Sequence, residues 1–415
     1  MASRVARLSA LGRQLARPQP GGEAWEVHRL AQARAPGPWP RPMVFLTYGV
    51  DASARPPAAA VAATCGALQR GGLTYAPSGG LRALREAVAA RQARWEGRPV
   101  APERVVVTSG AQMALYLSAR VALEAGDEVV VPEPMYATYP ATLAAAGATI
   151  VPVPLAPANN FALTGQMIAD RVTPRTKAVV LTNPHNPTGR VWERGLIAAV
   201  SQLCKERGLF CISDEVYRDF VFDGREYFVP SQFLHEADNC VFSVGSLSKS
   251  HSLVAWRMGW VVAPDPDTAA VVQALGDSVH FGLPQANQEG AVAALGSAGF
   301  AEGMAARYRE RRDAVVEGLR GVAGLEVLVP EAGMFCLVSA KGLGVSGADF
   351  AMRLLDFGVA TLPVDDWGAA MDGLFRVAFV ADVDVLRYAC GQIAQCAAEI
   401  GREGGRGGGG RQAQS

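Results

Sequence analysis

The sequence predicts an α/β protein, with a large domain built on a mainly parallel sheet of seven strands and a smaller α+β domain. Its 415 residues are enough for two domains, and a hydrophobic share of 50% is enough for a sizeable core. Between residues 105 and 263, short β-branched runs alternate with helical patterns, which is typical of a parallel sheet covered by helices on both faces. After residue 301 a long helical pattern leads to a second group of short strands.

Seven apolar runs are the predicted strands of the large sheet. They span residues 105–108, 128–131, 148–151, 177–181, 209–212, 240–244 and 259–262. Ligands of such sheets bind at the carboxyl ends of the strands. The polar motifs of this chain follow predicted strands directly, at residues 109–112, 183–189, 214–217 and 246–260. Their shared placement predicts one ligand site at this edge of the sheet.

The smaller domain is predicted from a helix rich in arginine and glutamate over residues 301–322. Strands at 325–328, 334–338 and 374–379 follow, with a helix over 348–357. We expect the large domain to span residues 61–310, the small domain 311–400, and the N-terminal arm and part of the small domain 1–60. The glycine-rich residues 401–415 have little to bury and are predicted to be disordered.

The composition argues against several classes of protein. The 39 basic and 39 acidic residues cancel, so no net field attracts nucleic acid or an anionic membrane surface. No apolar run approaches the roughly 20 residues of a membrane helix, which predicts a soluble protein. The seven cysteines are scattered without CxxC spacing, which favours reduced thiols, no bound metal and a cytoplasmic location. The basic first residues, with no acid before Glu23, are interpreted as a flexible arm, with a mitochondrial transit peptide as the lesser alternative.

Lysine is rare in this chain, and one lysine lies in the polar run that follows the strand predicted at 240–244. The four lysines are Lys177, Lys205, Lys249 and Lys341, against a combined lysine and arginine count of 39. Because arginine serves elsewhere as the plain positive charge, we expect Lys249 to be retained for its amine. Arginine can neither lose its proton nor form an imine, whereas a partly desolvated lysine can do both. The alternative, a surface lysine in a loop, is disfavoured by the neighbouring small hydroxyl residues and Arg257.

From about Tyr48 to about Glu399 the chain resembles the class I and II pyridoxal-phosphate (PLP) aminotransferases, which share PLP fold type I. The resemblance rests on the ordered motifs at 109–112, 183–189, 214–217 and 246–260. It implies that PLP is the cofactor and that Lys249 holds it through a Schiff base. It also implies that Lys249 then moves a proton as general base and acid.

A phosphate site is expected where the motif at 109–112 opens a helix. Backbone N–H groups and the helix dipole favour an anion there, although an ordinary helix cap gives the same local pattern. By resemblance, the phosphate-binding set comprises Gly110, Ala111, Gln112, Ser246 and Arg257, with Ser248 beside them.

The resemblance also assigns the residues around the cofactor ring. Asp214 matches the acid that pairs with the pyridine nitrogen and keeps it protonated, whereas the plain alternative is a helix N-cap. Tyr217 and Asn186 match positions that hydrogen-bond the ring oxygen. Tyr136 matches the aromatic residue that stacks on the ring, with Tyr139 as a possible substitute.

Three further residues are assigned by resemblance to the partner subunit and the substrate. Tyr75 matches a tyrosine that reaches the phosphate in the neighbouring subunit, which implies a homodimer with shared active sites. Arg376 would bind the substrate α-carboxylate with both arms of its guanidinium, although an exposed salt bridge is the default for an arginine that alternates with apolar residues on a strand. Gly49 would add a backbone N–H, and Asn186 is also placed at the substrate.

The side chain of the substrate is less determined. No arginine or lysine occurs in residues 278–284, and Gln112 stands where some relatives carry a lysine. A dicarboxylate donor is therefore not implied, and an amino acid with an apolar or unusual side chain is at least as compatible. His251 is interpreted as a packed histidine, the alternative being a group that diverts the reaction from transamination.

These observations together predict a PLP-dependent aminotransferase of amino acid metabolism, which moves an α-amino group between an amino acid and a 2-oxo acid. The alternative on the same fold is an elimination, replacement or cyclisation enzyme of specialised metabolism. A regulator that senses PLP is disfavoured, because about 40 residues before the recognisable body are too few for a DNA-binding domain.

Overall fold

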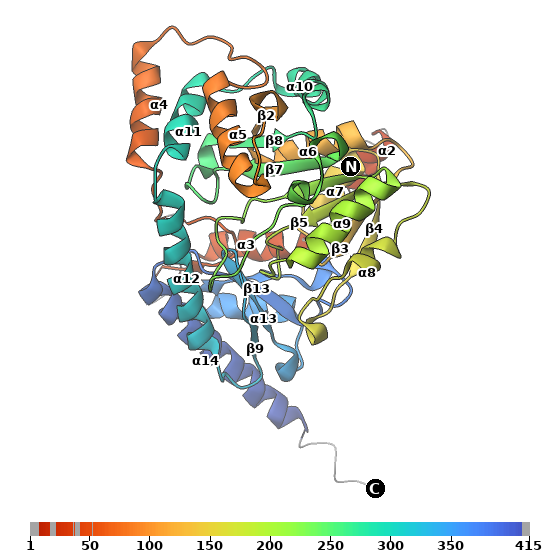
Figure 1. Cartoon of the computed structure of the whole chain (residues 1–415). Helices are drawn as coiled ribbons and strands as arrows, with labels where there is room; N and C mark the ends of the chain where they lie inside the picture. Colours follow the sequence, from red (N-terminus) through yellow and green to blue (C-terminus); the bar gives the residue numbers. More distant parts are fainter. Residues whose placement is uncertain (1–7, 17–21, 36, 38–41, 52, 409–415) are drawn as a thin grey trace.

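The computed structural model describes residues 8–16, 22–35, 37, 42–51 and 53–408. It contains a large sheet with its helices and a smaller group of strands and helices beside it (Figure 1). Residues 1–7, where the possible transit peptide begins, lie outside the described residues.

Seven strands form the large sheet in the spatial order β2-β8-β7-β6-β5-β3-β4. Their bounds are Val105–Ser109 (β2), Glu128–Glu133 (β3), Thr149–Pro154 (β4), Thr176–Thr182 (β5), Phe210–Asp214 (β6), Val241–Ser246 (β7) and Met258–Val262 (β8). β8 runs antiparallel to both β2 and β7, and the remaining neighbours pair in parallel. The predicted mainly parallel sheet of seven strands is confirmed.

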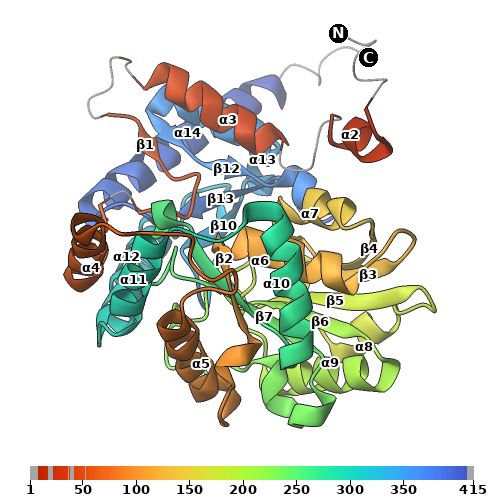
Figure 2. The ribbon, with the colours of Figure 1, turned by 90° about the horizontal axis from the view of Figure 1, so that it is seen from above.

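Helices cover both faces of this sheet (Figure 2). They are α4 (Ala58–Arg70), α5 (Arg82–Glu96), α6 (Gly110–Ala122), α7 (Tyr139–Ala145), α8 (Gly165–Ala169), α9 (Arg194–Arg207), α10 (Pro266–His280) and α11 (Gln285–Leu295). Because side chains alternate along a strand, Val106 and Val131 face the core beneath α6, α7 and α10. On the opposite face of the sheet, Val107 packs beneath α5 and α11, and Val130 packs beneath α8 and α9. The β-branched runs are apolar throughout because both faces are buried.

The smaller unit is an antiparallel sheet in the order β12-β13-β10-β9, joined by the parallel pair of β1 and β11. Its strands are β1 (Val44–Phe45), β9 (Glu326–Leu328), β10 (Phe335–Ser339), β11 (Val359–Ala360), β12 (Leu362–Pro363) and β13 (Leu374–Ala378). α3 (Gly22–Arg34) and α13 (Gly347–Leu354) pack together over β12, with α14 (Val383–Gly408) beside them (Figure 2). The short helix α2 (Ala10–Leu15) lies near α7. The pairing of β1 with β11 thus joins an early segment of the chain to one near its end.

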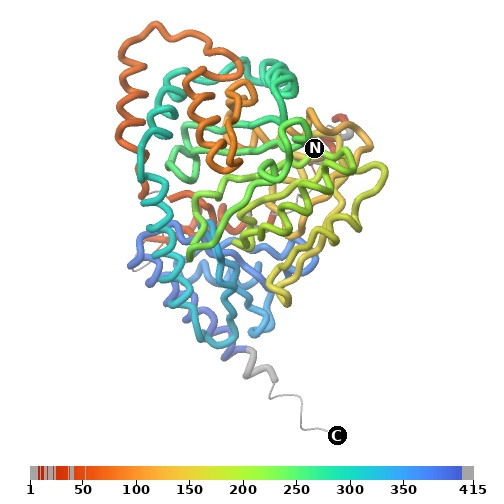
Figure 3. The backbone as a smooth tube through the Cα atoms, in the orientation of Figure 1, coloured from red at the N-terminus to blue at the C-terminus, as the bar shows by residue number. Residues whose placement is uncertain are grey.

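One uninterrupted helix, α12 (Phe300–Leu319), connects the two units, as the backbone trace shows (Figure 3). Its residues Tyr308, Val315 and Leu319 belong to the core of the smaller unit. The predicted boundary between residues 310 and 311 therefore falls inside a continuous helix. The domain limits given above stay a prediction.

Residues 401–408, which belong to the tail predicted to be disordered, continue α14 in the structure, and the disorder of the tail stays a prediction. The buried face of α14 packs against α12, and Glu403 forms an ion pair with Arg353 at 2.5 Å. Once a helix is nucleated by such packing, each further residue adds a backbone hydrogen bond, so glycine-rich residues can extend it. Residues 409–415 lie outside the described residues.

Candidate active site

The predicted site residues gather around one cavity of about 150 Å³ at the carboxyl end of the large sheet. Asp214 is the last residue of β6, Ser246 the last of β7 and Thr182 the last of β5. The described residues that line the cavity are Ala111, Gln112, Leu115, Tyr136, Thr182, Asn186, Asp214, Val216, Tyr217, Ser246, Ser248, Lys249, Val254 and Arg257. The position of the site follows from the topology, since parallel strands end at the same edge.

Lys249 extends from the loop between β7 and β8 into this cavity. Its Nζ donates a hydrogen bond to the carbonyl oxygen of Gly49 at 2.6 Å. Burial, together with the nearby charges of Arg376 and Arg257, lowers the pKa of Lys249 to about 8, although Asp214 acts to raise it. An amine that loses its proton near neutral pH can act as a nucleophile and carry a proton.

A cradle for an anion lies at the start of α6. Gly110 has a φ of +77°, and a Cβ added there would lie 2.4 Å from Nη2 of Arg257. Arg257 has itself a left-handed backbone, with φ +56°, and its Nη2 donates to the carbonyl of Ser109 at 3.2 Å. Glycine at position 110 therefore lets the guanidinium lie against the helix start, where the helix dipole also favours negative charge.

The remaining predicted phosphate residues flank this cradle. The hydroxyl groups of Ser246 and Ser248 are 2.8 Å apart. The side chain of Gln112 is hydrogen-bonded to two threonines, donating to Thr142 at 2.6 Å and accepting from Thr138 at 2.8 Å. The backbone of Gln112, rather than its amide, is thus left for an anion at the helix start.

Asp214 is buried and receives a hydrogen bond from a residue that the sequence did not assign to it. The hydroxyl of Tyr139 donates to Oδ2 of Asp214 at 2.7 Å and is also 2.7 Å from the hydroxyl of Thr182. Burial raises the pKa of Asp214, and hydrogen bonds from Tyr139 and the Val216 backbone, together with Lys249, partly counter that rise. A buried carboxylate of this kind is stabilised by a cationic partner such as a protonated ring nitrogen.

The aromatic and amide residues surround the space above Asp214. Tyr136 lines the cavity and makes edge contacts with Tyr139 at 5.8 Å and Trp367 at 6.4 Å between ring centres. Tyr139 points to Asp214 instead, so it is not the substitute for Tyr136 that the sequence left open. Tyr217 is buried, and burial raises the pKa of its hydroxyl more than the neighbouring Arg376 lowers it.

Arg376 approaches the cavity from β13 of the smaller unit and forms no ion pair within the described part of the chain. Nη1 donates to Oδ1 of Asn186 at 2.9 Å, and Nη2 donates to the carbonyl of Thr47 at 2.9 Å. Its Nε is buried without a hydrogen-bond partner. The guanidinium lies 4.8 Å from the ring centre of Phe335 and 5.3 Å from that of Trp367. The exposed salt bridge that was the default interpretation is wrong, because the guanidinium is buried beside Asn186.

One other sequence prediction differs in detail from the structure, and one agrees with it. Gly49 was expected to offer its N–H, and in the structure its carbonyl accepts the hydrogen bond from Lys249. His251 is packed away from the cavity, with Nδ1 2.8 Å from Oγ of Ser250 and its ring stacked on Phe300 at 5.6 Å. Burial lowers the pKa of His251 to about 4. The packed interpretation of His251 is the one that the structure supports.

Tyr75 is the one predicted cofactor residue that lies away from this cavity in the single chain. Its side chain is 78% exposed, and its ring meets that of Phe281 edge-on at 5.1 Å. The prediction that it serves a neighbouring subunit is neither supported nor contradicted by one chain.

The arrangement fits PLP as far as the residues themselves can show. The Lys249 amine, the cradle of Gly110 and Arg257, and the buried carboxylate of Asp214 line one cavity or border it directly. They supply, in turn, a group that forms an imine, an anion site and an acceptor for a protonated nitrogen. Arg376, with its unpaired Nε, adds a site for a second anion close to the amine.

Fold and site together define a PLP enzyme of fold type I. A family model, aminotransferase class I and II, matches residues 47–393. The chain belongs to this family, and it is a PLP-dependent aminotransferase.

Individual relatives agree with the family assignment. The arginine–pyruvate transaminase of Pseudomonas aeruginosa is 40% identical over 382 residues, which is 92% of this chain and 96% of the relative. The aspartate/prephenate aminotransferase of Thermus thermophilus is 31% identical over 79% of this chain and 84% of its own. A solved structure of the Thermus thermophilus aspartate aminotransferase, a single mutant, superposes with a TM-score of 0.86 at 29% identity, covering 94% of this chain and 99% of that one.

Proposed function

We propose that this aminotransferase takes arginine, or an amino acid with a similar cationic side chain, as amino donor and pyruvate as acceptor. The observation that carries the proposal is an acid-lined cavity of about 360 Å³ beside Trp367, lined by Glu133, Asp365 and Asp366. Trp367 also packs against the guanidinium of Arg376, so this acidic cavity and the proposed carboxylate site share a wall. The 40% identity with an arginine–pyruvate transaminase supports the same donor and acceptor.

In the part of the chain that the structure describes, the active-site cavity around Lys249 also lacks a further cation, which a dicarboxylate donor would need for its distal carboxylate. Among the described residues that line it, the only cations are Lys249 and Arg257, and these are assigned to the amine and phosphate roles. Gln112 is occupied by two threonines. A distal carboxylate would therefore meet no free cation among the described residues that line this cavity and would lie near acidic groups.

The proposed chemistry follows from the positions of the side chains. When bound, PLP supplies an electron sink for the substrate α-carbon. Arg376 holds the α-carboxylate, and Asn186 orients the guanidinium through its 2.9 Å hydrogen bond. The amine of Lys249 removes and returns the α-proton, because its lowered pKa keeps a neutral fraction at working pH. Asp214, steadied by Tyr139, holds a proton at the ring nitrogen, and Tyr217 is placed to hydrogen-bond the ring oxygen.

The donor is tested by adding amino acids singly to the purified holoenzyme and recording the visible absorption of the bound cofactor. We expect the kcat/KM for arginine to exceed that for aspartate by about a hundredfold or more, since an unpaired charge in the side-chain site is strongly rejected. Glu133→Gln should lower the kcat/KM for arginine about tenfold and leave that for alanine unchanged. Lys249→Ala is the control for the reaction itself and should abolish turnover.

Two outcomes would contradict this proposal. A preference for aspartate or glutamate would refute the cationic donor while leaving the aminotransferase intact. Release of ammonia or of a cleaved side chain, without consumption of a 2-oxo acid, would favour the elimination or replacement alternative.

We also propose a homodimer in which Tyr75 completes the site of the partner. Phe281, whose ring meets that of Tyr75, is itself exposed, as are Leu73, two residues before Tyr75, and Val271 and Val279 on α10. An exposed apolar group of this size is typical of a surface that another chain covers. We further propose a cytoplasmic location, supported by seven cysteines that all remain free thiols. Among the described residues, no helix combines the length and apolar character needed to cross a membrane.

A further inference from the structure

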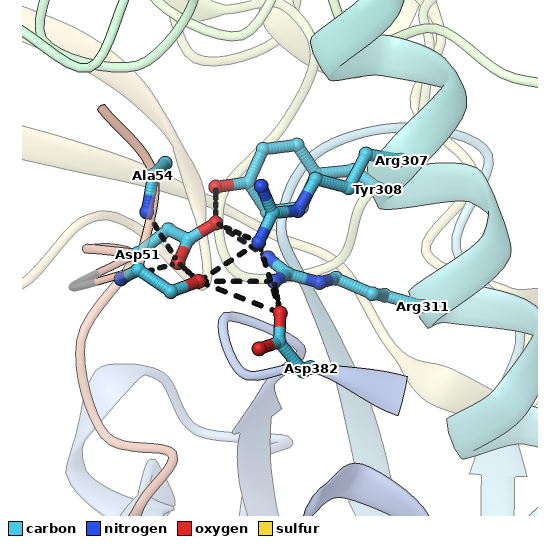
Figure 4. Close-up of polar contacts among 7 residues, drawn as sticks. Asp51, Ala54, Arg307, Tyr308, Arg311 and Asp382 are labelled. Carbon is cyan, nitrogen blue, oxygen red and sulfur yellow. Dashed lines mark hydrogen bonds and ion pairs between the residues drawn. The ribbon is translucent and has the colours of Figure 1, made fainter. Parts of the chain in front are cut away.

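Figure 4 shows a cluster of charged residues around Asp51, none of which lines the active-site cavity. Oδ2 of Asp51 accepts from Nη1 of Arg311 at 2.5 Å, and Oδ1 accepts from the backbone N–H groups of Ser53 and Ala54 at 2.9 and 3.1 Å. Nη2 of Arg311 donates to Asp382 at 2.8 Å. The side chains of Arg311 and Asp51 are 1% and 2% exposed, so their ion pair is fully buried.

The cluster joins three parts of the molecule. Asp51 belongs to the segment that follows β1, Arg311 to the middle of α12, and Asp382 directly precedes α14. Arg307, one turn before Arg311 on α12, donates to Asp382 at 2.9 Å and to the hydroxyl of Ser53 at 2.8 Å. The segment after β1 is thus attached both to the helix that connects the two units and to the start of the last helix.

This same segment makes two contacts inside the active site. The carbonyl of Gly49 accepts from Nζ of Lys249 at 2.6 Å, and the carbonyl of Thr47 accepts from Nη2 of Arg376 at 2.9 Å. Upstream, the backbone of Leu46 is fixed by hydrogen bonds to Ala360 and Ala378. Downstream, the side chain of Asp51 supplies the corresponding attachment. Residues 47–49 are therefore held from both ends across the amine and the guanidinium.

A buried ion pair is weak evidence for stability, since desolvation cancels most of the attraction between its charges. Its geometric effect is stronger, because a buried carboxylate with several fixed donors has a single favourable position. Hydrogen bonds from Ser53 and Arg311 hold the pKa of Asp51 below its ordinary value although burial acts to raise it. Asp51 thus remains ionised and attached to Arg311 at neutral pH.

We propose that Asp51 is a positioning residue for substrate binding, and that Arg311 and Asp382 hold it so that Gly49 and Thr47 set the relative position of Lys249 and Arg376. The proposal rests on the roles proposed above for Lys249 and Arg376. It predicts that loss of the Asp51 charge raises the Kd of a ligand that carries a carboxylate more than the Kd of an amine without one.

The test compares two unreactive probes on the PLP-loaded enzyme, read from the visible absorption of the cofactor. 2-Aminoisobutyrate has an amine and a carboxylate but no α-proton, and tert-butylamine is the same molecule with a methyl group in place of the carboxylate, so neither probe carries a proton that Lys249 could remove. In Asp51→Asn we expect the Kd of 2-aminoisobutyrate to rise about tenfold and that of tert-butylamine to change less than about twofold. A general loss of structure would weaken both probes alike.

Asp223→Asn is the matched control. Asp223 pairs with Arg312, the neighbour of Arg311 on the same helix, at 2.8 Å, and makes no hydrogen bond with the segment after β1 in the described structure. This variant should leave both dissociation constants unchanged. Should Asp51→Asn fail to fold, Asp382→Asn decides instead, because the Asp382 side chain is 59% exposed and contacts the same arginines. We expect it to weaken 2-aminoisobutyrate selectively, by about threefold.

The outcomes separate this proposal from the one on which it rests. Equal weakening of both probes, no weakening of either, or the same effect in Asp223→Asn would overturn the positioning role of Asp51. If Arg376→Ala binds 2-aminoisobutyrate as tightly as the wild type, the carboxylate site itself has been assigned to the wrong residue. If Arg376→Ala loses that binding and Asp51→Asn retains it, only the positioning role fails.

Discussion

At the scale of single residues, the site depends on side chains whose ionisation is set by burial. Lys249 has a pKa lowered to about 8, whereas burial raises the pKa of Asp214. The two shifts have opposite chemical consequences. The amine becomes available as a base, and the carboxylate becomes a strong acceptor for a proton on its partner.

The lowered pKa of Lys249 predicts a pH-dependent effect on the stability of the apoprotein. Between about pH 8 and the ordinary value of 10.5, the unfolded chain binds more protons at this lysine than the folded one, so its contribution to stability rises with pH. Below about pH 8 Lys249 is charged in the folded protein, and its burial then lowers the free energy of unfolding by the full amount. Lys249→Met should therefore raise the melting temperature by about 2 °C or more at pH 7, and this gain should vanish near pH 10.5.

Differential scanning calorimetry of the apoproteins from pH 7 to 10.5 measures this effect. Lys177→Met, which removes an exposed lysine from β5, is the control. A gain for Lys249→Met that is the same at every pH would show that packing, and not the amine, is responsible.

The sequence predicted most of these residues because each occupies a fixed place in an ordered motif. Asp214 ends a strand, and Asn186 and Lys249 lie in loops that begin where strands end, so the sheet fixes where these side chains start. The hydrogen bond from Tyr139 to Asp214 was not predicted, because the direction of the Tyr139 side chain depends on the turn that begins α7. Asp51 gave no signal, since its partner Arg311 lies 260 residues further along the chain. Trp367 gave none either, because no local motif encodes the turn between β12 and β13 that brings its ring against Arg376.

At the scale of elements, the start of α6 is shaped by a single glycine. Gly110 combines a φ of +77° with a guanidinium that would lie 2.4 Å from an added Cβ. A side chain there is opposed both by the backbone conformation and by the position of Arg257. The first turn of α6 and the arginine that closes the anion cradle thus depend on each other.

Gly110→Ala should accordingly weaken the binding of PLP by about tenfold or more. Pyridoxal, which lacks the phosphate, should bind the variant and the wild type with similar affinity. Titration of the apoprotein with both compounds, followed by absorption, measures this difference. Gly126→Ala is the control, because Gly126 also has a positive φ, of +99°, but an added Cβ would meet nothing within 4 Å.

An equal loss for PLP and pyridoxal in Gly110→Ala would show damage to the site as a whole. An equal loss in Gly126→Ala would assign the effect to backbone strain alone.

The elements themselves were predicted well where both faces of a strand are buried, since continuous β-branched runs have no other ready explanation. The antiparallel direction of β8 could not be predicted, because a short apolar run does not encode its direction. The extension of α14 to Gly408 was missed because composition alone ignores the packing that nucleates a helix.

At the scale of the whole molecule, one chain lacks a contact that the proposed function requires. Tyr75 is 78% exposed and lies outside the cavity of its own chain. If two chains share their sites, a chain without Tyr75 and a chain without Lys249 should complement each other.

Hybrids of Tyr75→Ala and Lys249→Ala chains, co-expressed with different tags and purified by both, test this. One of the two sites then combines Lys249 of one chain with the partner's Tyr75, and it should bind PLP as tightly as the wild type. The Tyr75→Ala homodimer should bind PLP about tenfold more weakly. Hybrids no tighter than that homodimer, or a monomer by analytical ultracentrifugation, would refute shared sites.

The antiparallel strand β8 also places the residues proposed to bind the cofactor on a different sheet from the arginine proposed to bind the substrate carboxylate. Lys249 and Arg257 lie on the one connection that leaves β7 and returns as β8, so covalent chain and sheet hydrogen bonds fix the distance between them. Arg376 belongs to a different sheet. Any rotation of one sheet against the other would therefore move the arginine that binds the substrate carboxylate and leave the distance between Lys249 and Arg257 unchanged.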